Sequence, residues 1–146
     1  RFKCDWSSDV CSSDLNEEAL AQYRKALEVD PKDPLAHANI AALLEKTGQT
    51  EAALEEYARA IENDPNNAAL LTNYGNALAQ ASRTEDAIAQ YRRALEKDAN
   101  YTPALCNLGI VLLETGAKED AAAQFRHVLE LDPNNAIAKE GLRQAK

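Results

Sequence analysis

The sequence of 146 residues has few aromatic side chains, which make up 5% of it, although hydrophobic residues of all kinds make up 45%. Much of that hydrophobic content is alanine, which has the highest helix propensity and lets helices approach one another closely. No segment shows the alternation typical of a strand. The composition therefore favours closely packed helices over a thick globular core.

Long hydrophobic runs are also lacking. No run approaches the roughly 18–20 apolar residues that span a bilayer, so we expect a soluble chain without a membrane partner. The net charge is −8 and no glycine-rich phosphate loop is present. An acidic chain of this kind is poorly suited to phosphate backbones, so we expect no nucleic-acid partner.

Residues that bind metals or carry out catalysis are few. Cys4, Cys11 and Cys106 form no CxxC pair, and His37 and His127 fall on different predicted helices. Nothing in their spacing matches a metal site or a nucleophile with its base. We therefore expect no metal, no cofactor and no catalytic residue, with Cys106 and His37 packed in helices and His127 solvated.

What the sequence has instead is a repeat with a constant period of 34 residues. A fixed period between twenty and fifty residues indicates a stack of supersecondary units. The aligned columns are Asn39/Asn73/Asn107, Ala41/Gly75/Gly109, Leu44/Leu78/Leu112, Ala53/Ala87/Ala121, Tyr57/Tyr91/Phe125 and Ala60/Ala94/Val128. A half copy precedes them, with Ala19, Tyr23 and Ala26 in the matching places.

Hydrophobic periodicity and helix-stopping residues predict two helices in each repeat. The expected helices are 16–29, 34–46, 50–63, 68–81, 84–97, 102–115, 118–131 and 136–145. Proline or glycine separates most of them, while Ser82 replaces a turn glycine and Ala99 replaces a proline. We expect a half repeat at 16–33, full repeats at 34–67, 68–101 and 102–135, and a capping helix at 136–146.

Residues 1–15 follow neither the period nor a helical pattern. Asp5–Leu15 resembles the translation of a common short-read sequencing adapter, which would make this segment non-native and would mean that the natural N-terminus is missing. The alternative is a natural arm rich in serine and aspartate. In either case we expect 1–15 to be non-native or disordered and the sequence to leave the compartment unknown.

Helix pairs of 34 residues with these columns resemble the tetratricopeptide repeat. The resemblance covers 16–146 and implies an all-α, right-handed superhelical solenoid of antiparallel helix pairs. The columns of alanine and glycine let the two helices of a pair approach closely. The column of aromatic residues fills the space against the neighbouring repeat. Ser82 departs from the pattern, because it stands where a turn glycine is usual.

In that family the first helices of the repeats line a concave groove that usually holds an extended peptide. The column Asn39, Asn73 and Asn107 would lie there, and a side-chain amide offers one donor group and one acceptor group, as a peptide backbone does. This resembles the asparagine ladder of O-linked N-acetylglucosamine transferases; the alternative is polarity merely tolerated on an exposed face. The predicted peptide-binding residues are Asn39, Asn73, Asn76, Asn107, Ile110 and Leu113.

Members of the family that bind chaperones hold a C-terminal carboxylate with a set of lysine, arginine and asparagine side chains. The matching positions here are Ala38, Ala42, Asn73, Pro103 and Asn107. Only the central asparagine fits and every cation is absent, so we do not expect this mode of binding.

We therefore predict a non-enzymatic scaffold for protein–protein interaction that binds a protein or peptide partner. The alternative is the substrate-recruiting arm of a larger enzyme, such as a glycosyltransferase, whose catalytic domain lies outside this sequence. Self-association is a third possibility, because Leu20, Tyr23 and Leu27 in the half repeat lack the first helix that would cover them.

Overall fold

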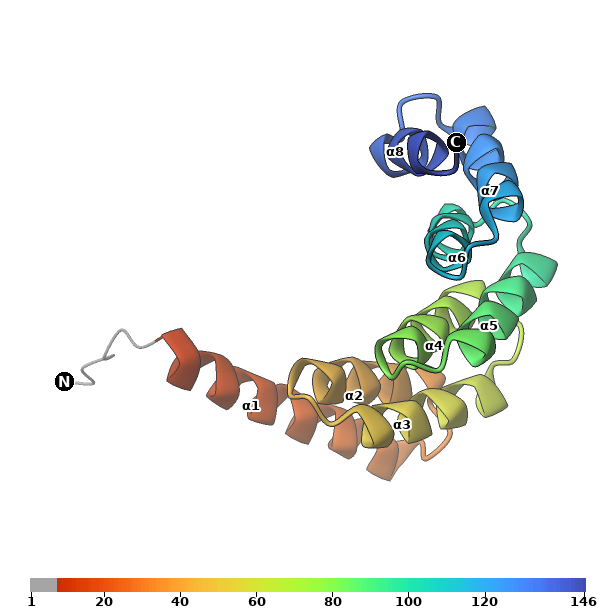
Figure 1. Ribbon diagram of the computed structural model, residues 1–146. Coiled ribbons are helices and arrows are strands. Elements are labelled where there is room, and N and C mark those ends of the chain that lie inside the picture. The colour runs from red at the N-terminus through yellow and green to blue at the C-terminus, as the bar shows by residue number, and fades with distance from the viewer. Residues whose placement is uncertain (1–7) are drawn as a thin grey trace. The chain divides into compact units, whose positions relative to one another are not determined.

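The computed structural model describes the backbone of residues 8–146 and the side chains of residues 15–146, and within these it contains eight α-helices and no strand (Figure 1). They are α1 (Ser8–Val29), α2 (Pro34–Lys46), α3 (Thr50–Asn63), α4 (Ala68–Gln80), α5 (Thr84–Lys97), α6 (Thr102–Glu114), α7 (Lys118–Leu131) and α8 (Ala136–Gln144). The all-α prediction is confirmed. From α2 to α8 each helix begins at the predicted residue and ends at it or one residue before.

The start of α1 differs from the prediction. The helix begins at Ser8 instead of at the predicted residue 16, and the expectation that residues 1–15 are non-native or disordered stays a prediction. Serine and aspartate are favoured near helix N-termini, and neither proline nor glycine interrupts the chain before Val29, so the helix extends toward the N-terminus. Residues 1–7 lie outside the described residues, and the origin of the segment stays a prediction.

The helices group into two compact units, Arg1–Asn63 and Asp64–Lys146. In the N-terminal unit α2 packs against both α1 and α3. In the C-terminal unit α4 pairs with α5 and α6 with α7, while α8 packs against both α7 and α6. The helices α4, α6 and α8 also contact one another in succession, so they form one continuous face of this unit. The division into repeats at 67/68 and 101/102 stays a prediction.

Three helices that follow a longer turn begin with a side-chain cap. Asp33 accepts a hydrogen bond from the backbone N–H of Leu35, Asn67 accepts from Ala69 and Leu70, and Asn135 accepts from Ala138. Aspartate and asparagine satisfy N–H groups that have no partner within the helix. These caps explain why α2, α4 and α8 begin where they do.

The turns inside the helix pairs share one backbone conformation. Gly48, Ser82 and Gly116 have positive φ angles of 76°, 60° and 81°. Each donates its N–H to a carbonyl three residues earlier, and the residue after each donates to a carbonyl five residues earlier, as in a Schellman helix end. Ser82 therefore adopts the left-handed conformation that glycine adopts in the other two turns.

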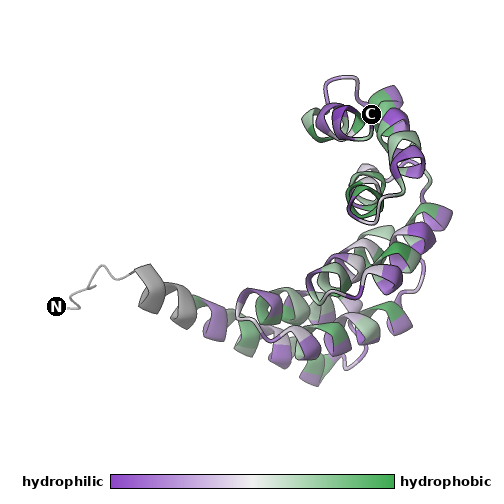
Figure 2. Cartoon of the chain, in the orientation of Figure 1, coloured by the Kyte–Doolittle hydropathy of each residue, from purple (hydrophilic) through white to green (hydrophobic). Residues whose placement is uncertain are grey.

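The aromatic column fills the space between helices. Tyr91 and Phe125 are 2% and 0% exposed, and a Cβ atom added at Gly75 would lie 2.6 Å from the ring of Tyr91. The ring of Phe125 is similarly close to Gly109 on α6 and Gly141 on α8. Glycine thus lets the backbone lie directly on the ring. Figure 2 shows both hydrophobic and hydrophilic residues on α5 and α7, and the buried residues of these helices include Tyr91 and Phe125.

The apolar residues of α1 are covered only in part. Leu20, Tyr23 and Leu27 are half-buried, because α2 packs against this helix. Self-association through them stays a prediction. Within the described part of the chain, no helix combines the length and the hydrophobicity needed to cross a membrane.

Candidate functional site

The face formed by α4, α6 and α8 carries two adjacent hollows. The first, which we call the α4–α6 hollow, measures about 330 Å³ and is lined by Asn76, Ala79, Gln80, Tyr91, Asn107, Ile110, Val111 and Glu114. The second, the α6–α8 hollow, measures about 460 Å³ and is lined by Ile110, Leu113, Glu114, Phe125, Ala136, Ile137, Glu140, Gly141 and Gln144. Both volumes lie in the range typical of ligand sites. Because Ile110 and Glu114 line both, the hollows form one continuous surface.

A chain of hydrogen bonds crosses the α4–α6 hollow. The Oδ1 atom of Asn76 accepts one hydrogen bond from the hydroxyl of Tyr91 at 2.8 Å and another from Nδ2 of Asn107 at 2.7 Å. Burial, with a smaller contribution from the charge of Glu114, raises the pKa of Tyr91 to about 12, so its hydroxyl stays protonated and donates at neutral pH.

These bonds determine which amide atoms face a ligand. The Oδ1 atom of Asn76 and one N–H of Asn107 are occupied by these hydrogen bonds. The bonds thereby assign the orientation of both side-chain amides. The NH₂ group of Asn76 and Oδ1 of Asn107 make no hydrogen bond to any side chain or backbone group in the described range. The pair therefore presents a donor and an acceptor next to each other.

The other two predicted asparagines are separate from this pair. Asn39 lies exposed on α2 of the N-terminal unit, and Asn73 lies exposed on α4 outside the lining of both hollows. Neither side chain hydrogen-bonds to a described residue. Of the four predicted asparagines, the structure brings only Asn76 and Asn107 into contact.

The predicted apolar residues lie together in the α6–α8 hollow. Ile110 is 38% exposed and Leu113 is half-buried. The sequence analysis missed Ile137, which is 53% exposed on the opposite wall. Glu114 lies at the junction of the hollows. The sequence signal for Ile137 was the position of α8, which begins one period after α6. This position makes α8 equivalent to the first helices of the preceding repeats, so it lies on the same face.

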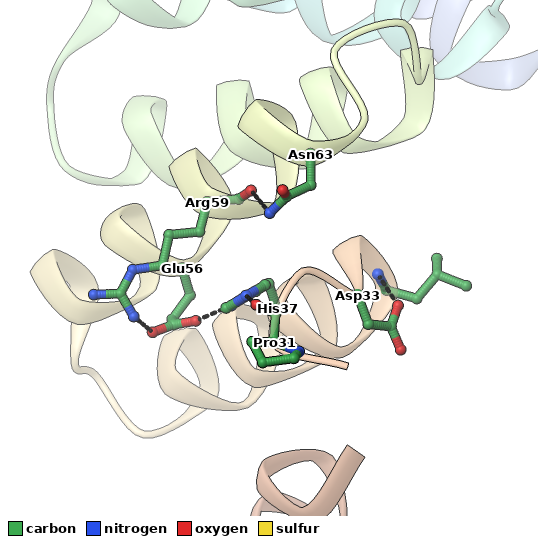
Figure 3. A network of polar contacts seen from close by, with 7 residues as sticks. Pro31, Asp33, His37, Glu56, Arg59 and Asn63 are labelled. Atoms are coloured by element: carbon green, nitrogen blue, oxygen red, sulfur yellow. Dashed lines mark hydrogen bonds and ion pairs between the residues drawn. The ribbon is translucent and has the colours of Figure 1, made fainter. Parts of the chain in front are cut away.

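His37 has a structural environment, as Figure 3 shows. It is 5% exposed, its Nδ1 lies 2.6 Å from Oε2 of Glu56, and its Nε2 lies 3.1 Å from the carbonyl oxygen of Pro31. The Nη1 atom of Arg59 donates to the other carboxylate oxygen of Glu56 at 2.9 Å. These contacts join α2 to α3 and to the preceding turn, and the predicted packing of His37 is confirmed.

The remaining residues with reactive groups also have packing roles. His127 is half-buried, with Nε2 3.1 Å from Oδ1 of Asn100. Cys106 is 5% exposed, and burial raises the pKa of its thiol. No group of three potential metal ligands occurs among the described side chains.

Antiparallel helix pairs whose first helices share one hollowed face define a class of helical repeat proteins that bind partners along that face. The tetratricopeptide repeat family model matches residues 39–102 and 72–136, and a second model of this repeat matches residues 15–48. The chain belongs to the tetratricopeptide repeat family.

Solved structures agree with this assignment. A structure described as the functional characterisation of Pseudomonas aeruginosa pilF is 30% identical over 92% of this chain and 62% of its own, with a TM-score of 0.84. The first such repeat domain of Spaghetti (RPAP3), bound to the HSP90 peptide SRMEEVD, is 27% identical over 80% of this chain and 92% of its own, with a TM-score of 0.75.

A third structure, that of MamA, shares the fold with a TM-score of 0.82 over 99% of this chain and 84% of its own, at 19% identity. A search of curated protein sequences found no significant match.

Proposed function

We propose that this protein is a scaffold that binds an extended peptide along the first helices of its repeats. The proposed contact residues are Asn39, Asn73, Asn76, Asn107, Ile110 and Leu113. The observation that best supports this proposal is the Asn76–Asn107 pair, which leaves one amide donor and one amide acceptor open beside two hollows.

An extended peptide presents its backbone N–H and C=O groups to a neighbouring surface, and these groups need partners when water is removed. The NH₂ group of Asn76 suits a peptide carbonyl, and Oδ1 of Asn107 suits a peptide N–H. Because Tyr91 is fully enclosed and donates to Asn76, the amide of Asn76 is held in the orientation that keeps its donor outward. Binding through the backbone would tolerate many peptide sequences.

The peptide bound by the RPAP3 domain contains two glutamates and an aspartate, and this chain lacks matching cations. The positions that hold cations in chaperone-binding members of the family are Ala38, Pro103 and Asn107 here. We therefore propose a partner other than an acidic chaperone tail.

The test compares the protein with its Asn39→Ala/Asn73→Ala/Asn107→Ala variant on an array of extended peptides. Each neutral hydrogen bond contributes about 0.5–1.5 kcal/mol, so loss of the three amides should weaken binding by roughly tenfold or more. Alanine is the better helix former, so a loss of binding with unchanged helical circular dichroism cannot come from unfolding.

The matched control is Asn66→Ala, which removes an exposed asparagine from the turn before α4. It should leave peptide binding unchanged. Equal binding by the protein and the triple variant would refute the proposal and would move the partner surface to other helices.

A further inference from the structure

The two hollows differ in chemistry from the acidic-peptide sites discussed above. Apolar side chains form the walls of the α6–α8 hollow, with Ile110 and Leu113 from α6 and Ile137 from α8. Carboxylates stand at its edge, because Glu114 lies at the junction of the hollows and Glu140 lies on α8. Among the described residues that line either hollow, none carries a positive charge.

Close helix packing sets the position of the apolar walls. The ring of Phe125 on α7 lies against Gly109 of α6 and Gly141 of α8, where any Cβ atom would meet it. This ring therefore fixes the distance between α6 and α8 and contributes to the lining of the hollow. The exposed isoleucines Ile110 and Ile137 are held on opposite walls by a rigid interior, and no side chain has to move to create the space.

The two carboxylates are not equivalent. Glu140 accepts hydrogen bonds from Arg143 at 2.8 and 2.6 Å and from Gln144 at 2.7 Å, and these bonds lower its pKa to about 2. Glu114 forms no ion pair with any described residue, and its charge contributes to the raised pKa of Tyr91 beneath the α4–α6 hollow. Glu114 is therefore the anion available to a ligand.

We propose that the peptide bound by this face carries one large aliphatic side chain in the α6–α8 hollow and a lysine or arginine beside it, facing Glu114. This inference rests on the proposed function and adds which residues of the bound peptide the site selects. An aliphatic side chain covers the exposed parts of Ile110 and Ile137, and a neighbouring cation compensates the charge of Glu114. An acidic neighbour would instead meet the carboxylate of Glu114, and no residue that lines the hollows carries a positive charge to compensate it.

The first experiment measures binding of the full chain to fluorescein-labelled peptides of equal length by anisotropy at low salt. They carry Lys-Leu-Lys, Lys-Ala-Lys or Glu-Leu-Glu at the centre of a glycine- and serine-containing segment, and the peptide SRMEEVD is a fourth probe. Basic residues on both sides make the test independent of peptide direction.

The peptide with Lys-Leu-Lys should bind most tightly. Replacing its leucine by alanine should weaken binding by about tenfold, the value of burying one aliphatic side chain. Replacing its lysines by glutamate should weaken binding by at least about threefold, and added salt should reduce this difference. Binding of SRMEEVD or Glu-Leu-Glu as tight as that of Lys-Leu-Lys would overturn the inference.

Variants test the assignment to this face. Glu114→Gln should reduce the preference for lysine, and Glu114→Lys should reverse it in favour of Glu-Leu-Glu. Ile137→Ala should remove most of the preference for leucine. Glu130→Gln and Leu131→Ala are the matched controls, because these exposed residues on α7 line neither hollow, and both should leave the binding pattern unchanged.

The outcomes separate this inference from the proposed function. Peptide binding that depends on the asparagines but shows no preference for leucine or lysine overturns the inference alone. No binding to any peptide overturns both. An uncharged hydrophobic dye is a further probe. If Ile137→Ala weakens binding of this dye as much as binding of the peptide, and Glu114→Lys changes neither, the ligand is a small apolar molecule and the inference is overturned. If the molecular mass of the protein in solution rises with its concentration, and Ile137→Ala abolishes this rise, the occupant of the hollow is a second copy of the chain and the inference is overturned.

Discussion

Replacing Ser82 by glycine should stabilise the protein, although the substitution removes atoms and adds no contact. Ser82 has a φ of 60° in a turn whose counterparts Gly48 and Gly116 have φ angles of 76° and 81°. The hydrogen bonds of the three turns correspond, with Ser82 N–H to Ala79 and Arg83 N–H to Leu78 at 3.0 and 2.9 Å. Of the three residues at the left-handed position, only Ser82 carries a Cβ atom.

The expected gain follows from two opposing terms. A residue with a Cβ atom in the left-handed region costs about 1–2 kcal/mol, and glycine removes this cost. Glycine also gives the unfolded chain more conformational freedom, which costs about 0.4–1 kcal/mol. The net stabilisation of Ser82→Gly should therefore be about 0.5–1 kcal/mol, and with a typical urea dependence it should raise the unfolding midpoint by roughly 0.3–0.5 M.

The assay is urea unfolding followed by circular dichroism at the helical band. Gly116→Ser is the reciprocal variant and should lose a similar amount, because no atom within 4 Å of the added Cβ complicates its effect. Ser82→Ala keeps the Cβ atom and should show no gain. An unchanged or lower midpoint for Ser82→Gly, together with a tolerated Gly116→Ser, would refute the reasoning from backbone conformation.

Three further predictions concern the interior of the C-terminal unit. Gly109→Ala should destabilise it by about 1–3 kcal/mol, because the new Cβ atom would lie 2.7 Å from the ring of Phe125; an unaltered urea midpoint would contradict this. Tyr91 should ionise near pH 12 in a difference titration against Tyr91→Phe, and its stabilising contribution should be complete below pH 10 and decline as the pH rises toward 12, since its folded pKa is raised. An ionisation near pH 10 in the folded protein would show that the phenol is not enclosed. Cys106 should react slowly with a thiol reagent until denaturant exposes it, because burial raises its pKa; rapid reaction without denaturant would show that the thiol is accessible.

Most of the helices and turns could be predicted because their boundaries carry local chemical signals. Proline before α2 and α4, a capping aspartate or asparagine, and glycine after α2 and α6 act within a few residues along the chain. The 34-residue period then showed that Ser82 stands in a glycine position. The start of α1 was missed because 8–15 lacks the repeat columns, although no proline or glycine interrupts the chain there.

The candidate site was predictable only in part. The repeat placed Asn107 and Ile110 on a first helix, but the bond from Asn107 to Asn76 joins different columns of the repeat and appears only when α4 and α6 are side by side. Ile137 was interpreted only as part of a capping helix. Its place in the hollow depends on how α8 packs on α6, which the sequence alone does not show. The 34-residue period alone therefore does not predict the side-chain contacts between neighbouring repeats.

The position of Phe125 between Gly109 and Gly141 has a consequence for how the C-terminal unit loses its structure. In a linear array of repeats the terminal elements fray most readily, and each contributes mainly through its nearest neighbour. Here α8, the last of the described helices, covers an aromatic ring that belongs to the preceding pair. Departure of α8 would bring that ring into water and loosen α6 from α7, so fraying at this end should proceed in steps of a helix pair rather than one helix at a time.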